Sequence, residues 1–188
     1  MRQKTIGALR PKLFIKDLLP TIHGPPPPEG WLKINTDAAY ANGCSTSGVI
    51  FKNKNGSVVL AATYFHHCPD AITAECLAIN DACSLAASAK IKKALFSSDS
   101  LNAVTSITNS PLNCFWTENP VVEKIKKSWN NWPHWTFNYS GRASNAAVHN
   151  LAKWGSQVSF AGIVPLDVIP LSVFCDLGFS IVDNIYNI

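Results

Sequence analysis

The spacing of apolar side chains changes near residue 70, and this change constrains the fold more than any other feature. Residues 31–39 alternate between two faces, and residues 47–51 and 57–65 are β-rich runs. An Asn-Gly dipeptide between the last two runs predicts a tight turn that joins them as a hairpin. Residues 70–89 then follow the 3.6-residue period of a helix. The pattern therefore predicts three consecutive antiparallel strands followed by a helix.

The second half of the chain adds strands and helices in turn. Residues 92–100 predict a short strand that ends in Asp99, and a helix is expected from Leu101. A strand, a helix and another strand in this order imply a right-handed crossover and a mixed sheet. Three further elements are predicted: a helix that starts at Asn119-Pro120, a strand over 134–140 and a helix over 145–160.

The length and composition fit one domain with tails. A chain of 188 residues with 47% hydrophobic and 15% charged residues is typical of a single globular domain. Residues 1–30 form a basic tail that ends in the proline-rich linker GPPPPEG. The domain is predicted over residues 31–162, and residues 163–188 are predicted to be a C-terminal extension.

Charge and cysteine usage restrict the partners and the compartment only loosely. The net charge of +4 permits a polyanionic partner without requiring one. The six cysteines show no CxxC pair and no zinc-finger spacing, so reduced, structural thiols in an intracellular protein are expected. No secretory signal and no membrane association are expected, because no apolar run is long enough. A nuclear or cytoplasmic location is predicted, and an organellar one stays open.

Three acidic residues fall at related places in this pattern. Asp37 lies within the first strand, Glu75 lies on the apolar face of the first helix, and Asp99 ends the fourth strand. If the first and fourth strands are adjacent, the three carboxylates meet, and such oxygen ligands suit Mg²⁺ or Mn²⁺ rather than zinc. Taken singly, Asp37 could cap a turn, Asp99 could cap the next helix, and Glu75 could form a buried ion pair.

Four segments, in this order and spacing, resemble the plant ribonuclease H-like domains related to retroelements. These segments are NTDAA (35–39), TAECLA (73–78), SSDSLNAV (97–104) and RASNAAVHNLAKWG (142–155). The C-terminal PLDVIPLSVFCDLG resembles the tail of those domains, so the likeness covers Trp31 to Gly178. The resemblance implies an α/β ribonuclease H-like fold with a five-stranded mixed sheet, three antiparallel strands and then two parallel, and helices on both faces.

The resemblance also implies ribonuclease H type-1 activity, in which two Mg²⁺ or Mn²⁺ ions support hydrolysis of the RNA strand of an RNA–DNA hybrid. It makes Asp37, Glu75 and Asp99 catalytic residues and metal ligands. His149 stands where ribonucleases H usually carry a fourth acid, and both a catalytic role and a plain helix-surface role stay open for it. The residues implied to contact the nucleic acid are Ala38, Ser100, Arg142 and Asn145. Ala38 departs from the glycine of many relatives.

Two other functions stay open beside the nuclease. A catalytically weak module could bind a hybrid or double-stranded RNA, and a domesticated retroelement fragment could act only in protein interaction. Lysines at 92–93 and 124–127 could meet phosphates, although solvated positions are favoured for most of them. Trp129, Trp132 and Trp135 could stack on nucleic acid, but packing in the core is the preferred interpretation. A monomer is expected.

Overall fold

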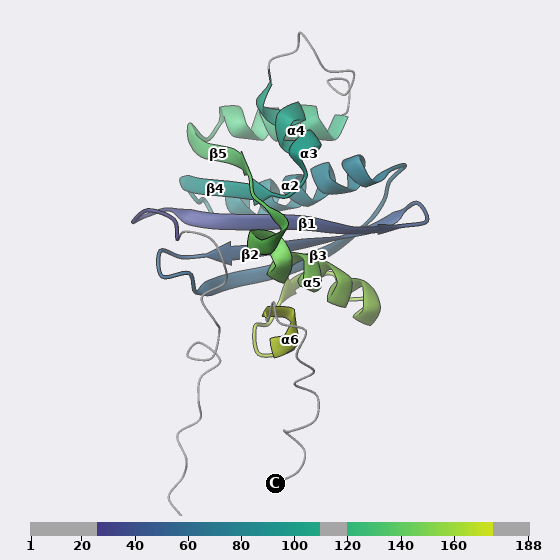
Figure 1. Ribbon diagram of the computed structural model, residues 1–188. Coiled ribbons are helices and arrows are strands. Elements are labelled where there is room, and N and C mark those ends of the chain that lie inside the picture. The colour runs from purple at the N-terminus through teal and green to yellow at the C-terminus, as the bar shows by residue number, and fades with distance from the viewer. Residues whose placement is uncertain (1–25, 110–119, 175–188) are drawn as a thin grey trace, which may run out of the picture.

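The computed structural model of the protein describes residues 26–109 and 120–174. The elements in chain order are β1 (Leu32–Ala41), β2 (Cys44–Lys52), β3 (Val58–His67), α2 (Ala71–Ser88), β4 (Lys93–Ser98), α3 (Leu101–Thr108), α4 (Pro120–Asn130), β5 (His134–Tyr139), α5 (Arg142–Val158), β6 (Gly162–Val164) and α6 (Leu171–Phe174). This is the predicted succession of strands and helices with β6 and α6 added (Figure 1). Asn119, predicted to start α4, lies outside the described residues.

The described strands form one mixed sheet in the order β5-β4-β1-β2-β3-β6. Strands β1, β2 and β3 are antiparallel neighbours, whereas β4 runs parallel to β1 and β5 runs parallel to β4. The crossover through α2 returns the chain to the edge of β1 that β2 leaves free, where β4 pairs parallel to β1. The predicted α/β architecture is confirmed.

The sheet has six strands, one more than the five predicted. Residues Gly162–Val164 pair antiparallel with β3, from Ala61↔Val164 to Thr63↔Gly162. The outer edge of β3 offers unpaired N–H and C=O groups, which a short apolar segment can satisfy. Val164 is 2% exposed and packs in the core, so the segment is held by side-chain burial as well as by backbone hydrogen bonds.

Helices cover both faces of the sheet, as predicted. α2 packs on one face and α5 on the other, and α3 and α4 lie beside α2 (Figure 1). Alternation along the strands explains this division: Val49 and Phe51 contribute to the cluster under α2, and Ile50 contributes to the cluster under α5. No helix among the described residues is both long and apolar enough to cross a bilayer.

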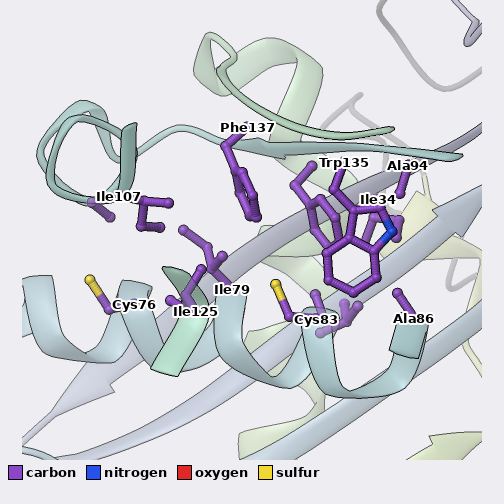
Figure 2. Packing of buried hydrophobic residues seen from close by; sticks show 14 of the residues in the cluster. Ile34, Cys76, Ile79, Cys83, Ala86, Ala94, Ile107, Ile125, Trp135 and Phe137 are labelled. Atoms are coloured by element: carbon purple, nitrogen blue, oxygen red, sulfur yellow. The ribbon is translucent and has the colours of Figure 1, made fainter. Parts of the chain in front are cut away.

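Figure 2 shows the core between the sheet and α2. Trp135 and Phe137 of β5 belong to the same cluster as Cys76 and Cys83 of α2. Trp135 is 1% exposed, and Trp129 and Trp132 are partly buried against the same cluster, so core packing of the tryptophans is confirmed. Among the described cysteines, those at 68, 76 and 83 are free and buried and the one at 44 is free and exposed.

α5 approaches the sheet closely because β2 carries a glycine beneath it. A Cβ atom on Gly48 would lie 2.6 Å from the Val148 carbonyl oxygen and 3.0 Å from the Ala152 amide nitrogen. Any side chain at this position would therefore push the helix away from the sheet. The close approach places the N-terminal half of α5 beside β1 and Asp37.

Candidate metal centre

Two of the three predicted acids lie where the parallel strands end. The parallel register of β1 and β4 stops at Thr36↔Ser98, so Asp37 and Asp99 are the next residues on the two strands. Crevices at the carboxyl ends of parallel strands are the usual location of sites in α/β folds. Asp37 is 3% exposed, and the strand on either side of it is held by hydrogen bonds to β2.

The third acid comes from α2, whose first residues line the same cleft. Asp70 caps this helix by accepting a hydrogen bond from the Thr73 amide at 2.7 Å. Glu75 then lies one turn into the helix and faces the sheet. Carboxylate oxygens of Asp37, Glu75 and Asp99 all lie within 4.8 Å of one another. The structure therefore brings the three acids together.

Burial and mutual repulsion make this group unfavourable by itself. Burial, and then the charges of Asp37 and Asp99, raise the pKa of Glu75 to about 9. Burial, and then the charge of Asp99, raise the pKa of Asp37 to about 6, although a hydrogen bond from His149 opposes the shift. A bound cation would stabilise the ionised carboxylates of Glu75 and Asp37 and so oppose both increases in pKa.

The residues present fit a divalent cation. The Oε2 atom of Glu75 is buried and has no hydrogen-bond partner among the described residues. Three carboxylates around one point supply only oxygen donors, which suit a hard cation of the Mg²⁺ type. Among the described residues, no other group of histidine, cysteine and acidic side chains shares this geometry.

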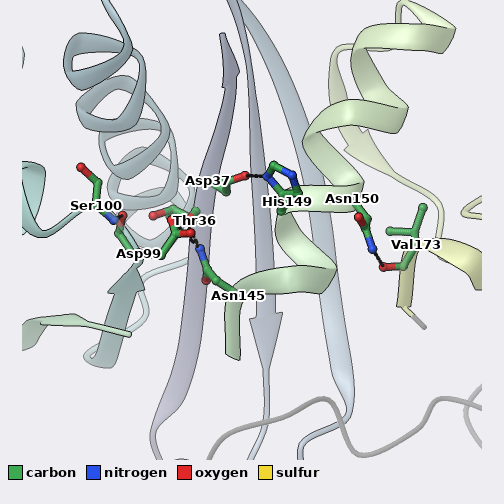
Figure 3. A network of polar contacts seen from close by, with 9 residues as sticks. Thr36, Asp37, Asp99, Ser100, Asn145, His149, Asn150 and Val173 are labelled. Carbon is green, nitrogen blue, oxygen red and sulfur yellow. Dashed lines mark hydrogen bonds and ion pairs between the residues drawn. The ribbon is translucent and has the colours of Figure 1, made fainter. Parts of the chain in front are cut away.

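His149 lies beside the three acids and contacts one of them. Its Nδ1 is 2.7 Å from Asp37 Oδ2, and its side chain is 45% exposed (Figure 3). An ionised Asp37 can only accept a hydrogen bond, so Nδ1 donates and Nε2 is left for other partners. His149 therefore orients the Asp37 carboxylate from α5.

The four predicted substrate contacts differ in their exposure. Ala38, Ser100 and Arg142 line an open cleft of about 630 Å³ together with the three acids and His149. Asn145 does not line it and is 1% exposed, so the structure leaves it no surface on which to touch nucleic acid. The Ser100 hydroxyl caps α3 by accepting a hydrogen bond from the Ala103 amide at 3.3 Å.

Some residues of this region were not predicted from the sequence. Leu101 and Asn102 follow Ser100 and also line the cleft. Their place in the first turn of α3, directly after Asp99 and Ser100, could have indicated this. Asn35 bonds to Asn145 beneath the cleft, and the period of two along β1 puts it on the same face as Asp37. Lys93, which the sequence offered as a possible phosphate contact, begins β4, at the opposite end of this strand from Asp99.

Comparisons with known structures find the same fold. Ribonuclease H1 from the archaeon Halobacterium salinarum is 15% identical with a TM-score of 0.59, over 68% of this chain and 98% of that chain. LC11 ribonuclease H1, in complex with an RNA/DNA hybrid, is 16% identical with a TM-score of 0.57, over 68% and 98%. The foamy viral protease-reverse transcriptase, also with a hybrid, is 18% identical with a TM-score of 0.52, over 85% and 22%.

No match was found among curated proteins. A family model described as reverse transcriptase-like matches residues 35–155, which include all three acids and His149. The match covers more than half of the chain, and the similar structures share its ribonuclease H fold. The chain therefore belongs to the reverse transcriptase-like family of ribonuclease H-like domains.

Proposed function

We propose that the protein is a metal-dependent endoribonuclease that hydrolyses the RNA strand of RNA–DNA hybrids. The observation that carries the proposal is the meeting of three carboxylates within 4.8 Å in an open cleft. Like-charged groups this close are costly, and the cost is offset when they share divalent cations. The proposed ions are two Mg²⁺, with Mn²⁺ as a substitute.

Two of the similar structures support nucleic acid as the partner. LC11 ribonuclease H1 and the foamy viral enzyme were both solved with RNA/DNA hybrids. The cleft of this chain is open, and the exposed guanidinium of Arg142 at its rim can bind a phosphate in a bidentate manner. Proteins distinguish RNA from DNA mainly by the 2′-hydroxyl and backbone shape, so no sequence preference is expected.

Each of the following residues of the cleft has a separate role in the proposed reaction. Asp37, Glu75 and Asp99 would hold the ions, which when bound activate a water molecule and stabilise charge on the leaving oxygen. His149 donates from Nδ1 to Asp37 Oδ2 and keeps this carboxylate fixed. Its other ring nitrogen, Nε2, is left for a contact with the substrate or a water molecule. Arg142 would orient the phosphate backbone.

A cleavage assay tests this proposal. A hybrid with labelled RNA is incubated with the full chain in Mg²⁺ and then in Mn²⁺, beside the Asp37→Asn variant. We expect cleavage by the wild type and a loss of at least ~100-fold in the variant, because the most buried carboxylate of the three is neutralised. Glu123→Gln, an exposed acid on α4, is the control and should cleave normally.

A second candidate is a module that binds hybrids without cleaving them. It is favoured by His149, which brings no negative charge where an acid is usual, and by the methyl group of Ala38 in the cleft. Equal binding of the hybrid by wild type and Asp37→Asn, with no cleavage by either, would support this module. Neither binding nor cleavage would point to a protein-interaction domain.

A further inference from the structure

Asn145 lies beneath Asp99 and makes three side-chain hydrogen bonds. Its Nδ2 donates to the Thr36 carbonyl oxygen at 2.8 Å and to Asp99 Oδ1 at 3.3 Å (Figure 3). Its Oδ1 accepts from Asn35 Nδ2 at 3.0 Å. Because Asn145 is 1% exposed, water cannot take over any of these bonds. The three bonds therefore hold its amide in one place.

The orientation of the Asn145 amide determines whether an N–H group or the amide oxygen faces Asp99. If the Asn145 amide were turned over, its oxygen would face the Thr36 carbonyl and the Asp99 carboxylate, which are both acceptors. Asn35 opposes that arrangement, because its Nδ2 needs an acceptor at the position of Asn145 Oδ1. The donor on Asn35 and the Thr36 carbonyl thus act together to keep an N–H group of Asn145 directed at Asp99.

An asparagine at position 35 of β1 destabilises the folded protein. It is 1% exposed, and its Oδ1 is buried without a hydrogen-bond partner among the described residues. An unpaired buried amide oxygen destabilises the folded state, and an apolar side chain of similar size would avoid this cost. The other contact of its Nδ2, with the Ser144 carbonyl oxygen, is long at 3.5 Å. Costs of this kind are typical of positions that serve a site.

We propose that Asn35 is a positioning residue for the candidate metal centre. Through Asn145 it holds the Asp99 carboxylate in the orientation that binds a divalent cation, and it touches neither the ion nor the substrate. The inference rests on the proposed function, because it takes Asp99 to be a metal ligand. Partners that orient metal ligands in this way typically contribute 10- to 100-fold in affinity.

The test measures Mn²⁺ binding to the full chain by the loss of the free-ion electron paramagnetic resonance signal. Asn35→Leu keeps the number of side-chain heavy atoms and the branch point, and it removes the hydrogen-bond donor. Ser47→Ala is the matched control, because the Ser47 hydroxyl is also buried without a partner, in the neighbouring strand. We expect Asn35→Leu to weaken binding about tenfold and Ser47→Ala to leave it unchanged. Both variants should melt within a few degrees of wild type.

A double-mutant comparison tests whether Asn35 acts through Asn145. In an Asn145→Leu background, Asn35→Leu should weaken Mn²⁺ binding no further, because the link to Asp99 is already missing. Equal weakening in both backgrounds would overturn the inference. If Asn35→Leu does not fold, Asn35→Ser is used in its place, since a serine hydroxyl is too short to reach Asn145.

The outcomes separate this inference from the proposed function. If the wild type binds Mn²⁺ and Asn35→Leu binds it equally well, the positioning role is wrong and the metal centre stands. If the wild type itself binds no Mn²⁺, both proposals fail. In the cleavage assay, excess Mn²⁺ should restore the activity of Asn35→Leu, which a general structural defect would not allow.

Discussion

At the scale of single residues, the protein keeps a carboxyl group where folding disfavours its charge. Glu75 lies on the inner face of α2, and burial together with two neighbouring acids raises its pKa to about 9 from 4.5. The folded state therefore favours the protonated form, whereas the unfolded chain ionises near the ordinary value. Without a cation, this residue makes the protein less stable as the pH rises between these two values.

The Glu75→Gln substitution tests whether Glu75 lowers the stability of the protein as the pH rises. In EDTA, the variant should gain stability over wild type as the pH rises from about 4.5 towards 9, reaching at least ~1 kcal/mol, since one pKa unit corresponds to about 1.4 kcal/mol. Thermal unfolding across this pH range provides the measurement. Glu123→Gln on the exposed side of α4 should show no such trend. A constant difference between Glu75→Gln and wild type would mean that Glu75 is not held protonated.

His149 offers a second test at this scale. Replacing it by aspartate would add a negative charge beside Asp37, and extra ligand charge strengthens the binding of hard cations. His149→Asp should therefore bind Mg²⁺ about tenfold more tightly in a calorimetric titration, whereas His149→Asn should not. Unchanged affinity in both variants would indicate that this position on α5 lies outside the range of the ions.

At the scale of elements, the site depends on how closely α5 packs on the sheet. α5 carries both His149 and Asn145, and it reaches β1 because Gly48 leaves room for its backbone. The turn between β1 and β2 also depends on the backbone conformation of individual residues. Asn42 and Gly43 both adopt a positive φ, 51° and 78°, so the turn is tight enough for β2 to begin at once.

Gly48→Ala tests the contact between α5 and β2. The added methyl group would lie 2.6 Å from a helix carbonyl oxygen, so we expect a loss of about 1–3 kcal/mol in the free energy of unfolding in urea. Mn²⁺ binding should weaken as α5 moves. Gly141→Ala, with nothing within 4 Å of the new atom, should cost less than about 1 kcal/mol. Equal costs would show that α5 can shift without strain.

At the scale of the whole molecule, the described residues after α5 complete the sheet and its core. β6 covers the edge of β3, and α6 buries Val173 and Phe174 in the cluster under α5. Val164, Val173 and Phe174, which lie in the predicted extension, thus contribute to the core. An edge strand covered in this way offers fewer free backbone groups for pairing with another chain.

Neighbouring residues of β6 provide the test of this arrangement. Val164 is 2% exposed and Ile163 is 57% exposed, because successive side chains of a strand face opposite sides. Val164→Thr should lower the free energy of unfolding by about 1–3 kcal/mol, since it buries a hydroxyl group without a partner. Ile163→Thr should change it by less than about 1 kcal/mol. The reverse order would mean that β6 is shifted by one residue.

The amino-acid sequence alone was sufficient to predict most elements and the three acids. Periodicity is a local property, so the period of two in β1 and of 3.6 in α2 could be recognised without knowledge of the partners. The same periodicity put Glu75 on the inner face of its helix, and the order of strands and helices predicted that the acids would meet. The geometry agrees.

The tertiary structure alone decided the contacts between distant segments. Asn35 and Asn145 are 110 residues apart in sequence, and no local pattern indicates that their amides meet. The same is true of β6, whose three residues are too few to show a period, and of Asn145, which was predicted to meet nucleic acid and is buried. Such contacts depend on the relative placement of whole elements, which only their packing determines.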